Sequence, residues 1–138
     1  MKVFTVPARV YWEDTDGGAI VYYANYLRYL ERARTEWLRS YGYSQQALAQ
    51  DPGILFTVVS LQVDYRAPAR LDDLLSVSCE PQPERQASVH FIQRIHRIVE
   101  GMPAQLLLDA SVRVACLDAR TLRPRRWPSF LVEDLVES

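Results

Sequence analysis

Hydrophobic and polar residues follow two different periods along the chain, and these periods predict its helices and strands. Over residues 26–41 apolar side chains recur every three or four positions, which places them on one face of a long helix. Gly42 ends this helix, and Asn25 stands where an N-cap residue is expected. A shorter helix is predicted for residues 44–49, because Asp51-Pro52-Gly53 stops it.

Strands are predicted on both sides of the long helix. Residues 3–12 are rich in β-branched and aromatic residues, which favours a first strand. Beyond residue 56 apolar and polar residues alternate with a period of two, the pattern of a strand with one buried face. The later strands are expected at residues 57–66, 75–80, 89–99 and 106–116, followed by a helical turn through Leu131 and Leu135. Because short connections without crossover helices join these strands, we expect antiparallel pairing.

This order of elements predicts an α+β fold, a five-stranded antiparallel sheet wrapped around one long central helix. The chain has 138 residues, so residues 1–138 are expected to form a single domain. One helix cannot cover every apolar strand position, and Val58, Leu107 and Leu117 are predicted to face outward. Dimerisation is a common way to cover such residues.

Charge and composition narrow the range of partners. The formal net charge is −1, from 16 basic and 17 acidic residues, which favours neither nucleic acid nor an anionic membrane as a partner. Residues 1–10 lack the apolar core of a signal peptide, and no uncharged run is long enough to span a membrane. Cys79 and Cys116 are expected to be buried free thiols in a reducing compartment. We therefore expect a soluble, cytoplasmic protein that acts on a small molecule.

Candidate chemistry is concentrated between the first strand and the long helix. Glu13, Asp14 and Asp16 precede two glycines and the start of the helix. Amides in the first turn of a helix lack intrahelical partners and carry partial positive charge, so they can hold an oxyanion. A carboxylate a few residues upstream can face the same substrate as a base or a nucleophile. The alternative is that Asp14 and Asp16 only form turn and capping hydrogen bonds.

Three stretches in this region carry a resemblance to a known family. They are residues 9–16 (RVYWEDTD), 21–26 (VYYANY) and 31–36 (ERARTE). Together they closely resemble the opening of the hotdog-fold acyl-CoA thioesterases of the 4-hydroxybenzoyl-CoA thioesterase class, and the nearest branch is the Tol-Pal-associated (YbgC-like) one. The likeness continues through residues 65–73 (YRAPARLDD) and the final strands, so it spans nearly the whole chain.

The resemblance implies a hotdog domain, a homodimer or homotetramer, that hydrolyses an acyl-CoA substrate to free acid and CoA at the subunit interface. The family's catalytic carboxylate falls on Asp16, and its oxyanion donor, a backbone N–H, falls on Tyr23. No cofactor and no metal is implied. Arg85 and Ser88 match a region that contacts the CoA nucleotide in relatives, although Arg85 also fits an ordinary solvated surface residue.

The chain departs from the Tol-Pal-associated branch at two places. That branch usually has His where this chain has Tyr23, and its two glycines lie one place later than Gly17-Gly18. The carboxylate mechanism is unaffected by these changes. They bear on any role for an imidazole and on the acyl preference of the branch.

Other functions fit the sequence less well. Asp14-Thr15-Asp16-Gly17 imitates the opening of the haloacid-dehalogenase-like phosphatases, but that chemistry needs a downstream lysine, and the only lysine is Lys2. His90 and His96 are too far apart in one strand to share a metal ion. The histidine-containing helix motif of hotdog dehydratases is absent from residues 22–40. A hotdog domain that binds acyl-CoA or an acyl carrier protein without catalysis remains the alternative. The basic cluster Arg120, Arg123, Arg125 and Arg126 fits a solvated tail, or a contact with phosphates or an acidic carrier protein.

Overall fold

The computed structural model describes residues 3–83 and 88–137. Two short 3-10 turns, η1 (Trp12–Asp14) and η2 (Tyr23–Asn25), lie between the first strand and the long helix. The strands are β1 (Phe4–Arg9), β2 (Ile54–Tyr65), β3 (Leu74–Pro83), β4 (Ser88–Val99) and β5 (Met102–Asp118), and the helices are α1 (Tyr26–Ser40), α2 (Gln45–Gln50) and α3 (Ser129–Glu137).

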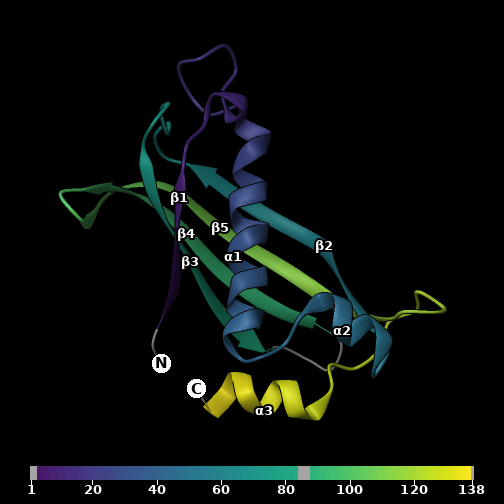
Figure 1. Cartoon of the computed structure of the whole chain (residues 1–138). Helices are drawn as coiled ribbons and strands as arrows, with labels where there is room; N and C mark the ends of the chain where they lie inside the picture. Colours follow the sequence, from purple (N-terminus) through teal and green to yellow (C-terminus); the bar gives the residue numbers. More distant parts are fainter. Residues whose placement is uncertain (1–2, 84–87, 138) are drawn as a thin grey trace.

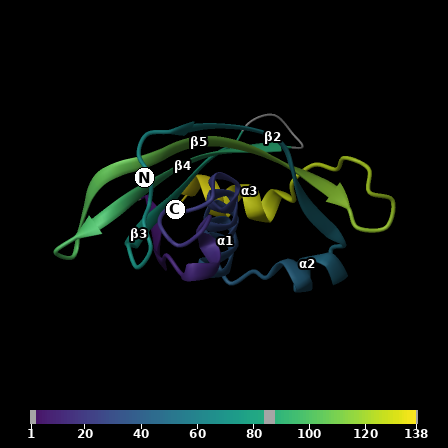
Figure 2. The ribbon, with the colours of Figure 1, turned by 90° about the horizontal axis from the view of Figure 1, so that it is seen from above.

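The five strands form one antiparallel sheet in the order β1-β3-β4-β5-β2, and the sheet curves over α1 (Figures 1 and 2). This confirms the predicted sheet and long helix. The shorter helix is also confirmed to within one residue, with Ser44 as its N-cap. The tail forms α3, which is longer than the predicted turn and lies across the C-terminal end of α1 (Figure 1). None of the described helices combines the length and the apolar composition needed to cross a membrane.

A fully buried polar side chain, Gln93 of β4, joins α1 to the sheet. Its amide nitrogen donates to the carbonyl oxygens of Leu30 (3.0 Å) and Ser78 (3.2 Å). Its amide oxygen accepts a hydrogen bond from the guanidinium of Arg34 (3.0 Å). Because these bonds satisfy the buried amide, it fixes the position of the helix on the sheet without an unsatisfied polar group.

The first strand is shorter than predicted, and its extension to residue 12 is wrong. β1 ends at Arg9, and Trp12–Asp14 forms the turn η1 instead. The carboxylate of Asp14 accepts a hydrogen bond from the N–H of Tyr11 (2.9 Å), and the N–H of Asp14 donates to the Tyr11 carbonyl (3.0 Å). These two bonds close the chain into a turn and override the strand preference of the aromatic residues.

The prediction that Leu107 faces outward is also wrong, because Leu107 is fully buried. The register of β4 on β5 shifts here, so that Ile95 pairs with Leu108 and His96 with Leu106. Leu107 is left as an extra residue in a bulge and turns inward, while its carbonyl accepts the N–H of Arg66 (2.8 Å). The two other positions behave as predicted: Val58 is exposed and Leu117 is half-buried.

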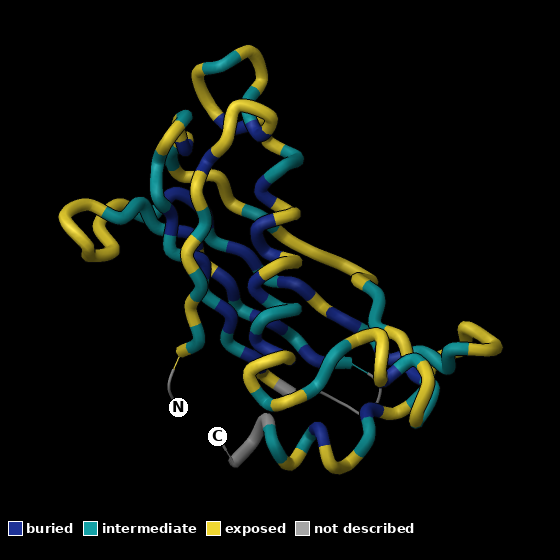
Figure 3. Tube along the Cα trace, viewed as in Figure 1, coloured by how far each residue is buried: buried dark blue, intermediate teal, exposed yellow. Residues whose placement is uncertain are grey.

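β2 forms one edge of the sheet and exposes much of its apolar surface (Figure 3). A bulge between Val58 and Ser60 interrupts its alternation, so Val58 and Val59 are both exposed. Further along the strand, Leu61 and Tyr65 are exposed as well. The opposite edge, β1, is only 6 residues long and contains Pro7, which discourages further pairing. The long apolar edge at β2 is therefore the edge that favours pairing with another strand.

Candidate active site

Asp14 anchors the segment that leads into α1. Its buried carboxylate accepts hydrogen bonds from the N–H of Tyr11 and the hydroxyl of Tyr29, both at 2.9 Å. Its carbonyl accepts the N–H of Tyr22 and the side-chain amide of Asn25, both at 3.0 Å. Burial and the hydrogen bond with Asp14 raise the pKa of Tyr29, so this phenol stays a donor. For Asp14 the structural alternative, turn and capping bonds, is therefore correct.

Asp16 lies two residues further along and has a different environment. Its backbone N–H donates to the carbonyl of Ile20 (3.0 Å), and Thr15 pairs with Val21 as an isolated bridge, so residues 15–21 form a small closed loop. The side chain is exposed. Within the described residues, no hydrogen bond or ion pair engages its carboxylate. The structure thus leaves one carboxylate free just before the helix.

Tyr23 is the first residue of η2, directly before α1. Its side chain is 63% exposed, and its carbonyl accepts a hydrogen bond from the hydroxyl of Tyr65 (2.9 Å). Its backbone N–H has no acceptor among the described residues. Asn25 occupies the N-cap position but its side chain makes no cap bond, because it reaches back to Asp14. An orphan amide with partial positive charge is therefore available at the start of the helix.

Tyr26 and Tyr65 also lie near the start of α1, although the sequence did not identify them as candidate site residues. The Tyr26 and Tyr65 rings meet edge to face, with centroids 5.6 Å apart. Burial raises the pKa of the Tyr26 hydroxyl, and the negative charges of Asp73 and Asp16 raise it further. The only sequence signal for Tyr65 was its place in the stretch 65–73. Its contact with Tyr23 is formed across 42 positions of the chain, which no local pattern reveals.

A cavity of about 230 Å³ lies between α1 and the β2 side of the sheet. Its apolar wall comes from the sheet, α1 and the tail, and its polar rim comes from α1 and α2. Neither Asp16 nor Tyr23 lines it. An enclosed space of about 150 Å³ suffices for benzene, so this cavity is large enough for a small acyl or aryl group. The residues that line the cavity include Arg34, Thr35, Thr57, Val58, Val114 and Trp127.

Comparison with known proteins assigns the family. Residues 10–135 match the family described as the thioesterase-like superfamily. The chain belongs to the thioesterase-like superfamily. It is 42% identical over 125 residues to the acyl-CoA thioesterase YbgC of Haemophilus influenzae, covering 91% of this chain and 88% of that protein. It is 43% identical over 132 residues to the acyl-CoA thioester hydrolase YbgC of Escherichia coli, covering 96% of this chain and 95% of that protein.

Solved structures of this superfamily share the architecture. A probable thioesterase from Bartonella henselae is 32% identical and superposes with a TM-score of 0.82, covering 92% of this chain and 100% of that one. The 4-hydroxybenzoyl-CoA thioesterase of Pseudomonas sp. strain CBS-3 is 24% identical with a TM-score of 0.86, covering 96% and 98%. The second likeness bears on the fold alone. The family predicted from the motifs and the hotdog architecture are confirmed.

Of the two other residues that the resemblance pointed to, the structure describes Ser88. Arg85 falls outside the described residues. Ser88 is half-buried at the start of β4 and pairs with Ala115, which pairs with Thr57 of β2. Ser88 therefore stands in the same row of the sheet as Thr57, which lines the cavity, whereas Tyr23 contacts Tyr65 at the other end of β2. A single chain does not bring Ser88 to Asp16 and Tyr23.

The basic cluster divides into separate environments. The guanidinium of Arg125 donates to the carbonyls of Pro52 (3.1 Å) and Gly53 (3.2 Å), so it ties the tail to the start of β2. Arg120, Arg123 and Arg126 differ from it: among the described residues their guanidinium groups form no hydrogen bond or ion pair, and all three residues are exposed. In residues 3–83 and 88–137, no group of His, Cys, Asp and Glu is arranged to hold a metal ion.

The shape of the loop of residues 15–21, which carries Asp16, depends on Gly18. Its φ is +98°, and a Cβ there would lie 2.2 Å from the Trp12 ring. Gly17 also has a positive φ, +126°, but a Cβ there would meet no atom within 4 Å. A side chain at either glycine would strain the backbone, but only a side chain at Gly18 would also clash with the Trp12 ring.

We predict that Gly18→Ala lowers the free energy of unfolding by about 1–3 kcal/mol, because it combines the strained φ with displacement of the Trp12 ring. Gly17→Ala is the matched control and should lose less. Chemical denaturation of both variants measures the difference. Equal losses in the two variants would show that the Trp12 contact contributes nothing.

Proposed function

We propose that this chain hydrolyses acyl-CoA thioesters with Asp16 as the catalytic carboxylate and the Tyr23 backbone N–H as the oxyanion donor. The observation that carries the proposal is the pair of free groups on one loop, a carboxylate and an orphan amide, at the positive end of α1. Relatives that share 42% and 43% of their residues with it over nearly the full length are acyl-CoA thioesterases. We place the protein in the cytoplasm, where its two unpaired cysteines stay reduced.

The chemistry needs no metal, because a thioester has a good leaving group. As a nucleophile, the Asp16 carboxylate attacks the thioester carbon, CoA thiolate departs, and water then hydrolyses the acyl-enzyme anhydride to the free acid. As a general base, Asp16 instead takes a proton from the water that attacks the same carbon. Both routes develop negative charge on the thioester oxygen. The N–H of Tyr23 stabilises this charge by a hydrogen bond.

We further propose that the active enzyme is a homodimer formed by pairing of two β2 edges. Antiparallel pairing about a two-fold axis near Ser60 brings the Tyr65 end of one strand beside the Phe56 end of the other. Tyr65 holds Tyr23, while Thr57 and Val58 line the cavity. The catalytic loop of one chain then faces the cavity of the other. This arrangement explains why neither Asp16 nor Tyr23 lines the cavity of its own chain.

Within this dimer the cavity holds the acyl group, and the CoA part extends toward the start of β4. Ser88 stands in the same row of the sheet as the cavity residue Thr57. We therefore propose that Ser88, and Arg85 three positions earlier in the sequence, contact CoA. An acyl carrier protein would present its thioester through the same phosphopantetheine arm. Two such dimers give the tetramer that the resemblance also allows.

We predict that Asp16→Asn lowers kcat for acyl-CoA hydrolysis by at least about 100-fold, because it removes the charge with little change in volume. Release of the CoA thiol measures the rate. Burial raises the pKa of the Cys79 thiol to about 12 and that of Cys116 to about 11, so the protein's own thiols react little with a thiol reagent near neutral pH.

Glu13→Gln is the matched control for this experiment, since Glu13 is also exposed and lies on the same segment. It should keep the wild-type kcat. Tyr23→Phe should keep it too, because the backbone N–H is unchanged. If Asp16→Asn retains more than about a tenth of the wild-type kcat, Asp16 is not the catalytic carboxylate, and a wild-type chain that binds acyl-CoA without turnover is a binding domain.

The dimer predicts that Val59→Lys yields a monomer without hydrolytic activity, because two lysines would meet near the two-fold axis. Light scattering should give twice the chain mass of 15.9 kDa for the wild type and the single mass for the variant. Val99→Lys at the end of β4 is the control, since Val99 is 50% and Val59 54% exposed. A wild-type monomer, or a Val59→Lys dimer with full activity, would contradict the proposed interface.

A further inference from the structure

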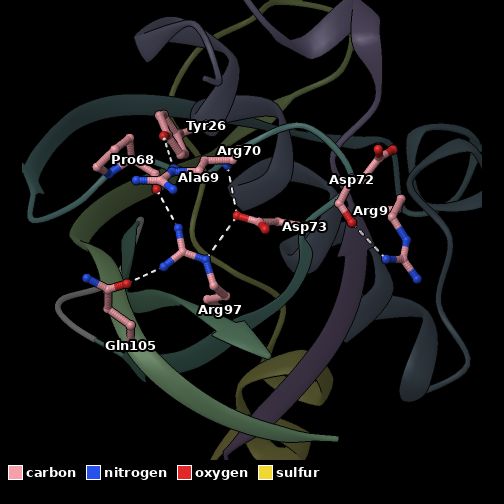
Figure 4. A network of polar contacts seen from close by, with 9 residues as sticks. All are labelled: Arg9, Tyr26, Pro68, Ala69, Arg70, Asp72, Asp73, Arg97 and Gln105. Carbon is pink, nitrogen blue, oxygen red and sulfur yellow. Dashed lines mark hydrogen bonds and ion pairs between the residues drawn. The ribbon is translucent and has the colours of Figure 1, made fainter. Parts of the chain in front are cut away.

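We propose that Arg97 is a positioning residue for the thioesterase reaction: it ties β4 and β5 to residues 68–73 (Figure 4), and this segment holds the loop that carries Asp16. The inference rests on the proposed role of Asp16. Arg97 itself does not reach the reacting groups. It acts through a short series of hydrogen bonds that ends at the backbone of the catalytic residue.

The guanidinium of Arg97 contacts three separate parts of the chain. Its Nε donates to the Asp73 carboxylate (3.0 Å), and one Nη donates to the Pro68 carbonyl (2.7 Å). The other Nη donates to the side chain of Gln105 on β5. The Arg97 and Asp73 side chains are only 20% and 21% exposed, so solvent screens their ion pair little. A planar guanidinium can direct three donors in this way, whereas an ammonium cannot match all three acceptors.

The same Asp73 carboxylate oxygen shapes the turn that follows β2. It accepts the N–H of Arg70 (2.8 Å) as well as the Arg97 bond, and the N–H of Asp73 donates to the Arg70 carbonyl (3.0 Å). Asp72 adopts a left-handed conformation with φ 72°, and its carbonyl accepts a hydrogen bond from Arg9 (2.8 Å). The backbone of Val10 also bonds to this turn, through Asp72 (3.0 Å) and Asp73 (2.9 Å), and Arg97 adds the side-chain link from β4.

The other side of this turn supports the catalytic loop. The N–H of Val21 donates to the Ala69 carbonyl (2.9 Å), and Ile20 forms an isolated bridge with Arg70. Ile20 in turn accepts the backbone N–H of Asp16 (3.0 Å). On the helix side, the N–H of Ala69 donates to the Tyr26 hydroxyl (3.0 Å). The segment therefore links Arg97 both to Asp16 and to the first turn of α1.

Charge supports the same assignment. Asp16, Asp73 and Arg97 all act on the pKa of the Tyr26 hydroxyl, which burial raises, and Arg97 opposes the two carboxylates. The Tyr26 hydroxyl therefore lies within electrostatic range of Asp16 and of the Arg97–Asp73 ion pair.

The experiment compares Arg97→Gln with Arg94→Gln in the full chain. Arg94 lies on the same strand and forms an ion pair with Asp109 (3.3 Å), but within the described residues it makes no hydrogen bond or ion pair with residues 68–73. Hydrogen exchange is measured at the amides of Asp16, Val21 and Leu71, the last of which donates to the Ala19 carbonyl on the same loop (3.3 Å). The values of kcat and KM are measured with an acyl-CoA. Arg97→Gln is expected to speed exchange at these amides and to lower kcat by about tenfold or more, with KM within about threefold because the proposed cavity and CoA contacts are intact. Arg94→Gln should change neither.

Several results would overturn the proposal. These are a kcat of Arg97→Gln within about threefold of the wild type, an equal loss in Arg94→Gln, or a loss of kcat without faster exchange at the loop amides. If Arg97→Gln does not fold, Arg97→Lys is the variant that tests the proposal, since one ammonium leaves some of the three acceptors unbonded. A lower kcat at unchanged KM in this variant supports the positioning role, and a wild-type kcat refutes it. If the wild-type chain hydrolyses no acyl-CoA, the proposed function fails, while hydrogen exchange still decides whether Arg97 holds the loop.

Discussion

Asp14 holds the start of α1 through four hydrogen bonds, two to its carboxylate and two to its carbonyl. These bonds fix the entry to the helix from outside, so no side chain needs to cap its first turn, and none does. The Tyr23 N–H consequently has no acceptor among the described residues. A residue that capped this amide would stabilise the helix and remove the proposed oxyanion donor. Two residues on, the loop closes through backbone bonds and through the hydrogen bond from the Gly18 N–H to the Thr15 hydroxyl (2.9 Å). The Asp16 carboxylate has no hydrogen-bond or ion-pair partner among the described residues.

The sequence predicted most of the fold, because helix and strand periods are local properties. It failed where individual side-chain hydrogen bonds or shifts in strand register override them. Asp14 turns the chain at Tyr11 in spite of strand-forming aromatics, and a bulge buries Leu107. The motifs point to Asp16 and Tyr23, but adjacent sequence could not reveal that Asp14 is structural. Nor could it reveal Arg97, whose contacts with Pro68 and Asp73 span 29 and 24 positions.

One chain contains the parts of a thioesterase site but not their assembly. Tyr23 contacts the Tyr65 end of β2, whereas the cavity residues Thr57 and Val58 and the row of Ser88 lie toward its Ile54 end. The long apolar edge at β2 lies between them. In the proposed dimer a two-fold axis through this edge exchanges its two ends. Association then completes the proposed site, because the edge that needs a partner strand lies between the two halves of that site.

Mixing two inactive variants tests this division of the site most directly. One chain carries Asp16→Asn, and the other carries Thr35→Trp, which fills the cavity that Thr35 lines. In a mixed dimer one site combines both defects, and the other combines an intact Asp16 with an intact cavity. The account predicts that mixing restores about a quarter of the wild-type rate, since half of the randomly formed dimers are mixed and each holds one intact site. No activity above that of the separate variants would contradict it, because Asp16 would then act on the cavity of its own chain.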